Sequence, residues 1–228
     1  FLALPILREG NLMGILMLSF SDRQQHWPQT DLKLLQVAAD LIGGALVRQC
    51  LANELERQAS HDGLTGLYNR RKFENLLLHE LGRADRYHRP AAVILLDVDH
   101  FKAVNDRHGH DVGDEVLCQL SAILHEQIRD SDVAARWGGE EFIILLPETD
   151  LDGALHLADS LRQHIADTPF PAIGQVTVSL GVSAYQRDET LDSLIKRADD
   201  ALYQAKAAGR NRVHLAASGG EGELSAEC

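Results

Sequence analysis

Hydrophobic and polar residues follow two different periods along the first 60 positions of the chain. Ala3–Arg8 and Leu12–Phe20 are apolar, strand-like runs, and the Glu-Gly-Asn sequence between them at 9–11 is typical of a hairpin turn. A helical period follows, in which Thr30 is a suitable N-cap and Asp31 favours the positive end of the helix dipole. We therefore expect a hairpin and then a helix.

The helical pattern continues much further than one helix of ordinary length requires. Its apolar positions alternate three and four residues apart, although Arg48 interrupts the series and Gly43-Gly44 weakens it locally. This spacing favours a helical stalk that pairs with a second copy of the chain; the alternative is an amphipathic helix that packs on its own domain. The apolar positions are Ala38, Leu41, Ala45, Ala52, Leu55 and Ala59.

The remainder of the chain alternates between helical and strand-like patterns. The continuous apolar run Ala92–Leu96 predicts a buried central strand, and Val133–Trp137 with Phe142–Leu146 predicts a two-stranded hairpin. Gln175–Ala184 predicts a later strand, and Leu191–Ala208 predicts the last long helix. The expected order is helix, strand, two helices, hairpin, helix, strand and helix.

The composition narrows the classes of function. The formal charge of −12, from 34 acidic and 22 basic residues, argues against a protein that binds nucleic acid through its phosphates. Cys50, Cys118 and Cys228 are far apart, have no metal-ligand spacing and are typical of reduced thiols in a cytoplasmic protein. No apolar run reaches the roughly 18 residues of a membrane span, so we expect no membrane contact within this sequence. An upstream membrane anchor stays open, since the sequence does not begin with Met.

Two carboxylates leave the end of the predicted central strand. In Asp97-Val98-Asp99, the period of two puts both acidic side chains on one face. Carboxylates at such a strand end form the kind of site that Mg²⁺ prefers when it carries nucleotide phosphates. The alternative is a pair of solvated acids at the end of a strand.

A glycine-rich turn carries a second acidic pair. Gly138 and Gly139 supply unusual dihedral angles or let a ligand approach the backbone. Adjacent Glu140 and Glu141 point to opposite faces if the chain is extended there, so we expect only one of them to complete a metal site with Asp97.

The sequence Arg-Trp-Gly-Gly-Glu-Glu-Phe at 136–142 resembles the signature hairpin of the GGDEF family of diguanylate cyclases, in its GGEEF form. The resemblance includes Asp-Gly-Leu-Thr at 62–65, Asn-Arg-Arg at 69–71, residues 97–102, Gly-His-Asp at 109–111 and Gly-Arg-Asn at 209–211. It implies an α/β (α+β) fold, a ferredoxin-like palm whose central, mostly antiparallel sheet is flanked by helices.

The N-terminal hairpin and the start of the long helix resemble, more loosely, the end of a GAF sensor domain. We therefore expect four parts: a GAF-like remnant with its exit helix at 1–48, a helical linker or stalk at 49–60, a GGDEF domain at 61–215, and a tail at 216–228. The tail is rich in Gly, Ser and Glu and is expected to be disordered.

Carried over position by position, the resemblance implies a role for each polar residue of the site. Asp97, the Val98 backbone carbonyl and Glu140 would hold Mg²⁺ or Mn²⁺, and Glu140, assisted by Glu141, would activate the attacking hydroxyl. The implied substrate-binding positions are Asn105 and Asp114 for guanine, Lys102, Lys206 and Arg210 for the triphosphate, and His110, Gly138 and Gly139 beside the nucleotide.

The implied reaction joins two GTP molecules into cyclic di-GMP with loss of two pyrophosphates. Each GTP presents its 3′-hydroxyl to the α-phosphate of the other, so the enzyme would act as a homodimer, held through the stalk. The alternative is a non-catalytic module that binds GTP or cyclic di-GMP and signals; the intact pair Glu140 and Glu141 favours the enzyme. A polymerase palm is disfavoured by the acidic charge.

A separate Arg-x-x-Asp sequence, from Arg129 to Asp132, resembles the family's site for inhibition by bound cyclic di-GMP. The alternative is two solvated charges at a helix end. Relatives often carry a second arginine for this site after the hairpin, at the position of Ser160 in this chain. The resemblance therefore implies product inhibition that is weaker or that uses another geometry.

Overall fold

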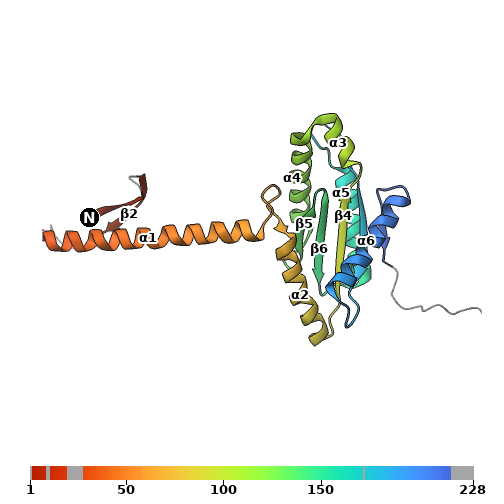
Figure 1. Ribbon diagram of the computed structural model, residues 1–228, viewed down its shortest axis with the longest axis horizontal. Helices are drawn as coiled ribbons and strands as arrows, with labels where there is room; N and C mark the ends of the chain where they lie inside the picture. The colour runs from red at the N-terminus through yellow and green to blue at the C-terminus, as the bar shows by residue number, and fades with distance from the viewer. Residues whose placement is uncertain (1, 9–10, 20–27, 172, 217–228) are drawn as a thin grey trace, which may run out of the picture. The chain divides into compact units, whose positions relative to one another are not determined.

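The computed structural model of the chain describes residues 2–8, 11–19, 28–171 and 173–216 (Figure 1). The chain divides into two compact units, residues 1–59 and residues 60–228. The tail expected to be disordered lies outside the described residues from 217 onward, as do Cys228 and the turn positions 9 and 10. Cys50 and Cys118 are free thiols.

A hairpin and one long helix make up the described part of the first unit. β1 (Leu2–Arg8) pairs antiparallel with β2 (Asn11–Leu18), and α1 runs from Gln29 to Ser60. The helix begins before the expected cap at Thr30, because the Pro28 carbonyl already accepts the first helical N–H groups. Hairpin and helix were therefore predicted correctly, and only the boundary differs.

The glycine pair in α1 has a packing role. A Cβ at Gly43 would lie 2.5 Å from Cγ2 of Ile6, so a larger residue would push the hairpin away from the helix. Gly43 is itself buried, and this close approach offsets its low helix propensity. Elsewhere on α1 large apolar side chains are exposed, among them Leu41 at 69% and Leu55 at 66%.

α1 also bears on the expectation about membranes. The helix contains an 18-residue window with a mean hydropathy of 1.3, of which 11% is buried. By length and composition one helix of the described chain is thus able to cross a membrane, which corrects the expectation that no segment reaches that length. Core helices of soluble proteins reach the same length and hydropathy, so these two properties of α1 do not assign it to a membrane.

A six-stranded sheet forms the centre of the second unit, with the order β3-β5-β6-β4-β7-β8. The inner pairs β5/β6, β6/β4 and β4/β7 are antiparallel, while the outer strands β3 and β8 run parallel to their neighbours. This is the expected palm with a mostly antiparallel sheet. The strands are β3 (Tyr68–Asn69), β4 (Ala91–Val98), β5 (Val133–Gly138), β6 (Glu141–Pro147), β7 (Val178–Ala184) and β8 (Val213–Leu215).

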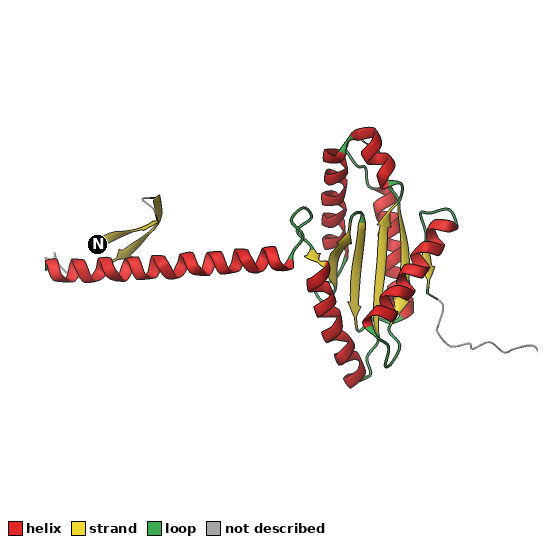
Figure 2. Ribbon diagram, in the orientation of Figure 1, coloured by secondary structure: helices red, strands yellow, loops and turns green. Residues whose placement is uncertain are grey.

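Helices lie on both faces of this sheet (Figure 2). Alternate residues of β4 separate the two faces: Ile94 and Leu96 belong to the core under α3, α4 and α5, whereas Val93 and Leu95 belong to the core under α2 and α6. The helices are α2 (Arg70–Tyr87), α3 (Phe101–His108), α4 (His110–Gln127), α5 (Leu151–Asp167) and α6 (Leu191–Ala207).

The expected order of elements in this unit is confirmed, with two additions and one shift. β3 and β8 contain two and three residues, too few for a periodic pattern to be seen. The strand expected from Gln175 begins at Val178. β4 is buried along its whole length, and its carboxyl end carries the first candidate carboxylate, Asp97, into the site.

Candidate functional site

The turn between β5 and β6 has the geometry that its glycines predict. Gly139 has a φ of +51°, in the left-handed region that residues with a Cβ rarely adopt. A Cβ at Gly138 or Gly139 would meet no atom within 4 Å, so the surface of the turn is open. The β5–β6 register shifts between Arg136 and Gly138, as at a bulge. A ligand is therefore able to approach the backbone of the turn.

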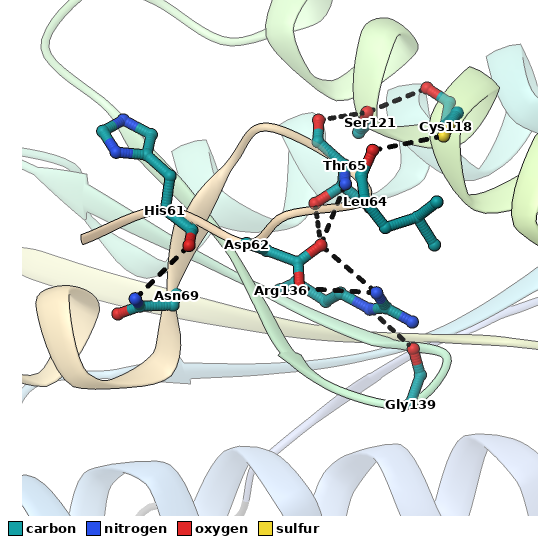
Figure 3. A network of polar contacts seen from close by, with 9 residues as sticks. All are labelled: His61, Asp62, Leu64, Thr65, Asn69, Cys118, Ser121, Arg136 and Gly139. Carbon is teal, nitrogen blue, oxygen red and sulfur yellow. Dashed lines mark hydrogen bonds and ion pairs between the residues drawn. The ribbon is translucent and has the colours of Figure 1, made fainter. Parts of the chain in front are cut away.

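Arg136 anchors the turn to the segment that precedes α2 (Figure 3). Its Nε donates to the Gly139 carbonyl at 2.9 Å, and its Nη1 donates to the two oxygens of Asp62 at 3.2 and 3.4 Å. Asp62 also accepts from N and Oγ1 of Thr65 at 2.9 and 2.7 Å. Burial raises the pKa of Asp62, but the Thr65 and Arg136 donors outweigh it and hold this pKa below its usual value.

Asp97 is the buried acid of the site. It lies at the end of β4, paired in the antiparallel register with Glu141 of β6, and is 7% exposed. Nζ of Lys206 lies 2.8 Å from its Oδ2. Burial raises the pKa of Asp97 and outweighs the opposing effect of Lys206, and the charges of Glu140 and Asp99 raise it further. The carboxylate of Asp97 is therefore not fully stabilised in its charged form by Lys206 alone.

Both hairpin acids take part in this charge cluster. Burial raises the pKa of Glu141, the charge of Asp97 raises it further, and Lys206 lowers it. Glu140 lies at the turn, where its carbonyl accepts the Val98 N–H at 3.4 Å. Glu141 is thus the strand neighbour of Asp97, and Glu140 lies beside Val98. That only one of the two completes a metal site stays a prediction.

The donor set fits a hard divalent cation. Among the described residues, no group of three or more His, Cys, Asp and Glu side chains is placed to hold a metal. A cation at the hairpin would therefore need a backbone oxygen as well as the carboxylates of Asp97 and Glu140; the Val98 carbonyl is the candidate, because Val98 follows Asp97 directly and its N–H bonds to the Glu140 carbonyl. Oxygen ligands of this kind suit Mg²⁺, which otherwise keeps water or phosphate oxygens.

The end of α6 places Lys206 and Arg210 next to each other. The Arg210 N–H donates to the Ala205 carbonyl at 3.1 Å and the Gly209 N–H to the Lys206 carbonyl at 3.3 Å, the two hydrogen bonds of a Schellman motif. Gly209 has the positive φ of +114° that this motif needs. The helix therefore ends at Ala207, one residue after Lys206, and Arg210 follows three residues later.

The helix pair α3 and α4 holds the expected guanine-binding residues. The Asn105 Oδ1 is buried and has no hydrogen-bond partner among the described residues. A Cβ at Gly113 would collide with this oxygen, so the glycine next to Asp114 leaves the room that the amide occupies. An unpartnered buried acceptor is costly unless something binds it, typically about 1–3 kcal/mol. Lys102 and His110 are exposed on the same two helices.

The Arg-x-x-Asp sequence forms a turn ahead of β5. The Asp132 N–H donates to the Arg129 carbonyl at 2.9 Å, and Oδ2 of Asp132 accepts the Arg129 N–H at 3.1 Å. Two cavities adjoin it: one of about 300 Å³ reaches Tyr68, and one of about 290 Å³ is lined by His156 and Ser160. Ser160 thus borders the same cavity as Arg129 and Asp132, as its place in the sequence predicts.

Comparison with known proteins decides the family. Residues 59–212 match the family described as "Diguanylate cyclase, GGDEF domain", and residues 1–46 match the family described as "GAF domain". The chain belongs to the GGDEF diguanylate cyclase family. Diguanylate cyclase DgcM of Escherichia coli K12 is 46% identical over 167 residues, which are 72% of this chain and 40% of DgcM. The chain thus spans less than half the length of that relative.

Solved GGDEF structures agree with the fold. The active GGEEF domain of a diguanylate cyclase from Vibrio cholerae is 40% identical, with a TM-score of 0.64 over 66% of this chain and 97% of that one. The coiled coil and GGDEF domain of DgcB from Caulobacter crescentus, in complex with c-di-GMP, is 29% identical, with a TM-score of 0.73 over 83% and 100% of the two chains.

The structure of the GGDEF domain adds contacts that the sequence did not predict. Asp62 and Arg136 belong to the family motifs, but nothing in their spacing shows that they meet 74 positions apart. Asp99 accepts hydrogen bonds from Thr177, Ser179 and the backbone of Asn211, and because Ser179 is the register partner of Asp97, the two carboxylates lie on one face as the alternation predicts. No pattern in the sequence indicates these three partners, which lie 78, 80 and 112 positions away from Asp99.

Proposed function

We propose that the GGDEF domain of this chain condenses two GTP molecules into cyclic di-GMP and two pyrophosphates. The observation that carries the proposal is the charge cluster at the hairpin: Asp97 and Glu141 face each other at the strand ends, with Lys206 at 2.8 Å from Asp97 and an open glycine turn beside them. Relatives named as diguanylate cyclases support the same reaction.

The residues of the cluster have different proposed roles in binding the cation, accepting the proton and binding the triphosphate. A bound Mg²⁺ or Mn²⁺ would stabilise charge on the α-phosphate and the leaving pyrophosphate. Asp97, the Val98 carbonyl and Glu140 are the proposed ligands. Glu140 also accepts the proton of the attacking 3′-hydroxyl, and Glu141, whose pKa burial raises, assists beside it. The proposed triphosphate contacts are Lys206, Arg210 and Lys102, with Gly138 and Gly139 against the nucleotide and His110 beside it.

Guanine recognition is proposed for Asn105 and Asp114. The buried, unpartnered Oδ1 of Asn105 is an acceptor that needs a donor, and the Asp114 carboxylate is a second acceptor. Guanine presents N1–H and N2–H donors on one edge, whereas adenine has an acceptor at N1. GTP is therefore the proposed substrate rather than ATP.

The proposed active form is a homodimer joined through α1. The exposure of Leu41 and Leu55 in the single chain supports pairing with a second copy, since both belong to the apolar series of the stalk. Leu55→Glu, within the stalk at 49–60, is expected to shift sedimentation toward the monomer and to lower activity at dilute protein, whereas Lys33→Glu on the same helix changes neither. Equal dimerisation by both variants would contradict the stalk.

The proposed limits of the parts are those expected from the sequence: sensor remnant to residue 48, stalk at 49–60 and cyclase domain at 61–215. The family matches at 1–46 and 59–212 support them. Nothing in the charge of −12 favours nucleic acid as a partner. A cytoplasmic location of the cyclase domain is proposed, because its substrate GTP is found there.

Product inhibition is proposed at Arg129 and Asp132. The cavities on either side of this turn support a bound ligand, and the complex of DgcB with c-di-GMP shows that a related domain binds the product. Arg129 would grip phosphate or stack on guanine through its planar guanidinium. Because Ser160 borders the cavity in place of an arginine, inhibition is expected to be weaker than in relatives that carry one, or to use another geometry.

The test of the proposed function is incubation of the purified chain with GTP and Mg²⁺ after removal of carried-over cyclic di-GMP. Product measured by chromatography is expected for the unchanged chain and for Glu126→Gln, an exposed acid on α4, and is expected to be absent for Glu140→Gln. If no product forms even at high protein concentration with the stalk dimerised artificially, the proposal of an enzyme is wrong and that of a non-catalytic receptor takes its place.

A further inference from the structure

Asp99 is the second acid of the Asp-Val-Asp sequence, and its carboxylate is already engaged. The residue is 6% exposed. Its Oδ1 accepts from Oγ of Ser179 at 2.7 Å, and its Oδ2 accepts from Oγ1 of Thr177 at 2.8 Å and from the backbone N–H of Asn211 at 3.0 Å. Asp99 therefore has three short hydrogen bonds to protein donors, whereas Asp97, two residues earlier, has an ion pair with Lys206.

The bond to Asn211 reaches an unusual stretch of backbone. Gly209, Arg210 and Asn211 have φ values of +114°, +62° and +46° in succession. Residues with a Cβ rarely adopt such values, and they persist only where surrounding contacts hold them. Besides the Asp99 bond, the amide oxygen of Asn211 accepts from Arg162 Nη1 at 3.2 Å.

This stretch carries Arg210 at the end of α6. The Schellman hydrogen bonds fix the chain up to the Arg210 N–H, and the Leu180 N–H fixes it again at the Arg212 carbonyl at 2.9 Å. Between these two points, the hydrogen bond from the Asn211 backbone N–H to the Asp99 carboxylate connects the loop to the end of β4, where the candidate carboxylates lie. Arg212 Nε also donates to the Arg210 carbonyl at 3.0 Å, so the direction in which Arg210 leaves the loop depends on Asp99 together with this contact inside the loop.

We propose that Asp99 is a positioning residue, which holds the left-handed loop at Asn211 and so sets Arg210 beside Lys206 at the triphosphate site. The role in catalysis rests on the proposed function, because it assumes that Arg210 contacts GTP. The hydroxyls of Thr177 and Ser179 orient the carboxylate, and the sheet at β7 supplies the rigid base for it. Asp99 is accordingly not a ligand of the proposed cation.

The first test needs no substrate. In Asp99→Ala the amide proton of Asn211, followed by NMR in the unliganded protein, is expected to exchange with solvent at least about tenfold faster. Asp99→Asn keeps one acceptor oxygen for Asn211 and can donate to Ser179, so it is expected to restore most of the protection. The control is Tyr185→Phe. Tyr185 directly follows the other end of β7, and the change removes the 2.8 Å hydrogen bond that its hydroxyl donates to the Asp85 carboxylate. Unchanged exchange in Asp99→Ala and Asp99→Asn would overturn the proposal, whatever the activity.

The second test uses the reaction. Asp99→Ala and Arg210→Ala are each expected to raise KM for GTP about tenfold with kcat changed much less, and the double variant is expected to add little to either. If the effects of the two single variants on KM add fully in the double variant, Asp99 does not act through Arg210 and the proposal is overturned. A weakened Mg²⁺ dependence in Asp99→Ala like that of Asp97→Ala would make Asp99 a metal ligand and also overturn it. If the unchanged chain forms no cyclic di-GMP, the proposed function fails, while the Asn211 exchange still decides the role of Asp99.

Discussion

The contact between Arg136 and Asp62 gives the most direct test of how the hairpin is held. Arg136→Met keeps most of the apolar volume and removes the hydrogen bonds to Asp62 and to the Gly139 carbonyl. Hydrogen bonds to charged groups contribute about 1.5–3 kcal/mol. The side chains are 18% and 24% exposed, so solvent screens the pair in part, and we expect a loss of about 2 kcal/mol in the free energy of unfolding.

The matched control is Arg89→Met, which removes an ion pair to Glu148 whose side chains are 54% and 47% exposed. It is expected to change the unfolding free energy by only about 0.5 kcal/mol or less. Urea unfolding followed by circular dichroism measures both variants. Because the freed turn carries Gly139, cyclic di-GMP synthesis by Arg136→Met is expected to fall by about tenfold to a hundredfold. Equal destabilisation by the two variants would refute the reasoning from burial.

The same pair predicts a dependence on pH. The pKa of Asp62 is lowered on folding, with 3.8 as its ordinary value. A depressed carboxylate pKa stabilises the fold above the unfolded-state pKa, and this contribution is lost as pH falls through the lower folded-state value. Without Arg136 the pKa of Asp62 rises toward or above its ordinary value. Acid unfolding of Arg136→Met is therefore expected at a higher pH than that of the unchanged chain, and an identical acid midpoint would count against the contribution of the pair.

Two further variants test the rest of the site. Gly113→Ala places a Cβ against Oδ1 of Asn105 and is expected to raise KM for GTP by about tenfold, or roughly 1.4 kcal/mol, while Gly82→Ala, where a Cβ meets no atom within 4 Å, leaves KM unchanged. Lys206→Met removes the cation that lowers the pKa of Asp97, so NMR titration should find that pKa higher still and the acid limb of the pH–activity profile moved to higher pH. A lower pKa of Asp97 in this variant would show that the ion pair has been assigned wrongly.

Local patterns predicted much of the fold. β4 is a run of apolar residues because both faces of the sheet are covered, so its burial is visible in its composition. The hairpin at 138–141 shows itself through its glycines, since a positive φ at Gly139 restricts the residue that can stand there. The short strand at Val213–Leu215 gave no such signal, because three residues that join a sheet edge carry no period.

The candidate site divides in the same way. Asp97, Glu140 and Glu141 stand next to structural signals, a buried strand end and a glycine turn, so the sequence by itself was enough to single them out and to indicate a cation. The partners of these residues depend on the tertiary structure alone. Lys206 reaches Asp97 from a helix more than a hundred positions away, and no local period encodes that contact.

Asp99 shows where the sequence argument ends. Alternation along β4 correctly put Asp97 and Asp99 on one face, but the donors that Asp99 meets there, among them Ser179 and the backbone of Asn211, lie in distant segments that the alternation does not indicate. The sequence by itself thus determined most of the elements, the family and the candidate acids, because these depend on local periods and on residue type. Which acid meets a lysine and which meets a loop was decided only by packing, because hydrogen bonds between distant segments depend on the register of the sheet and on how the helices pack against it.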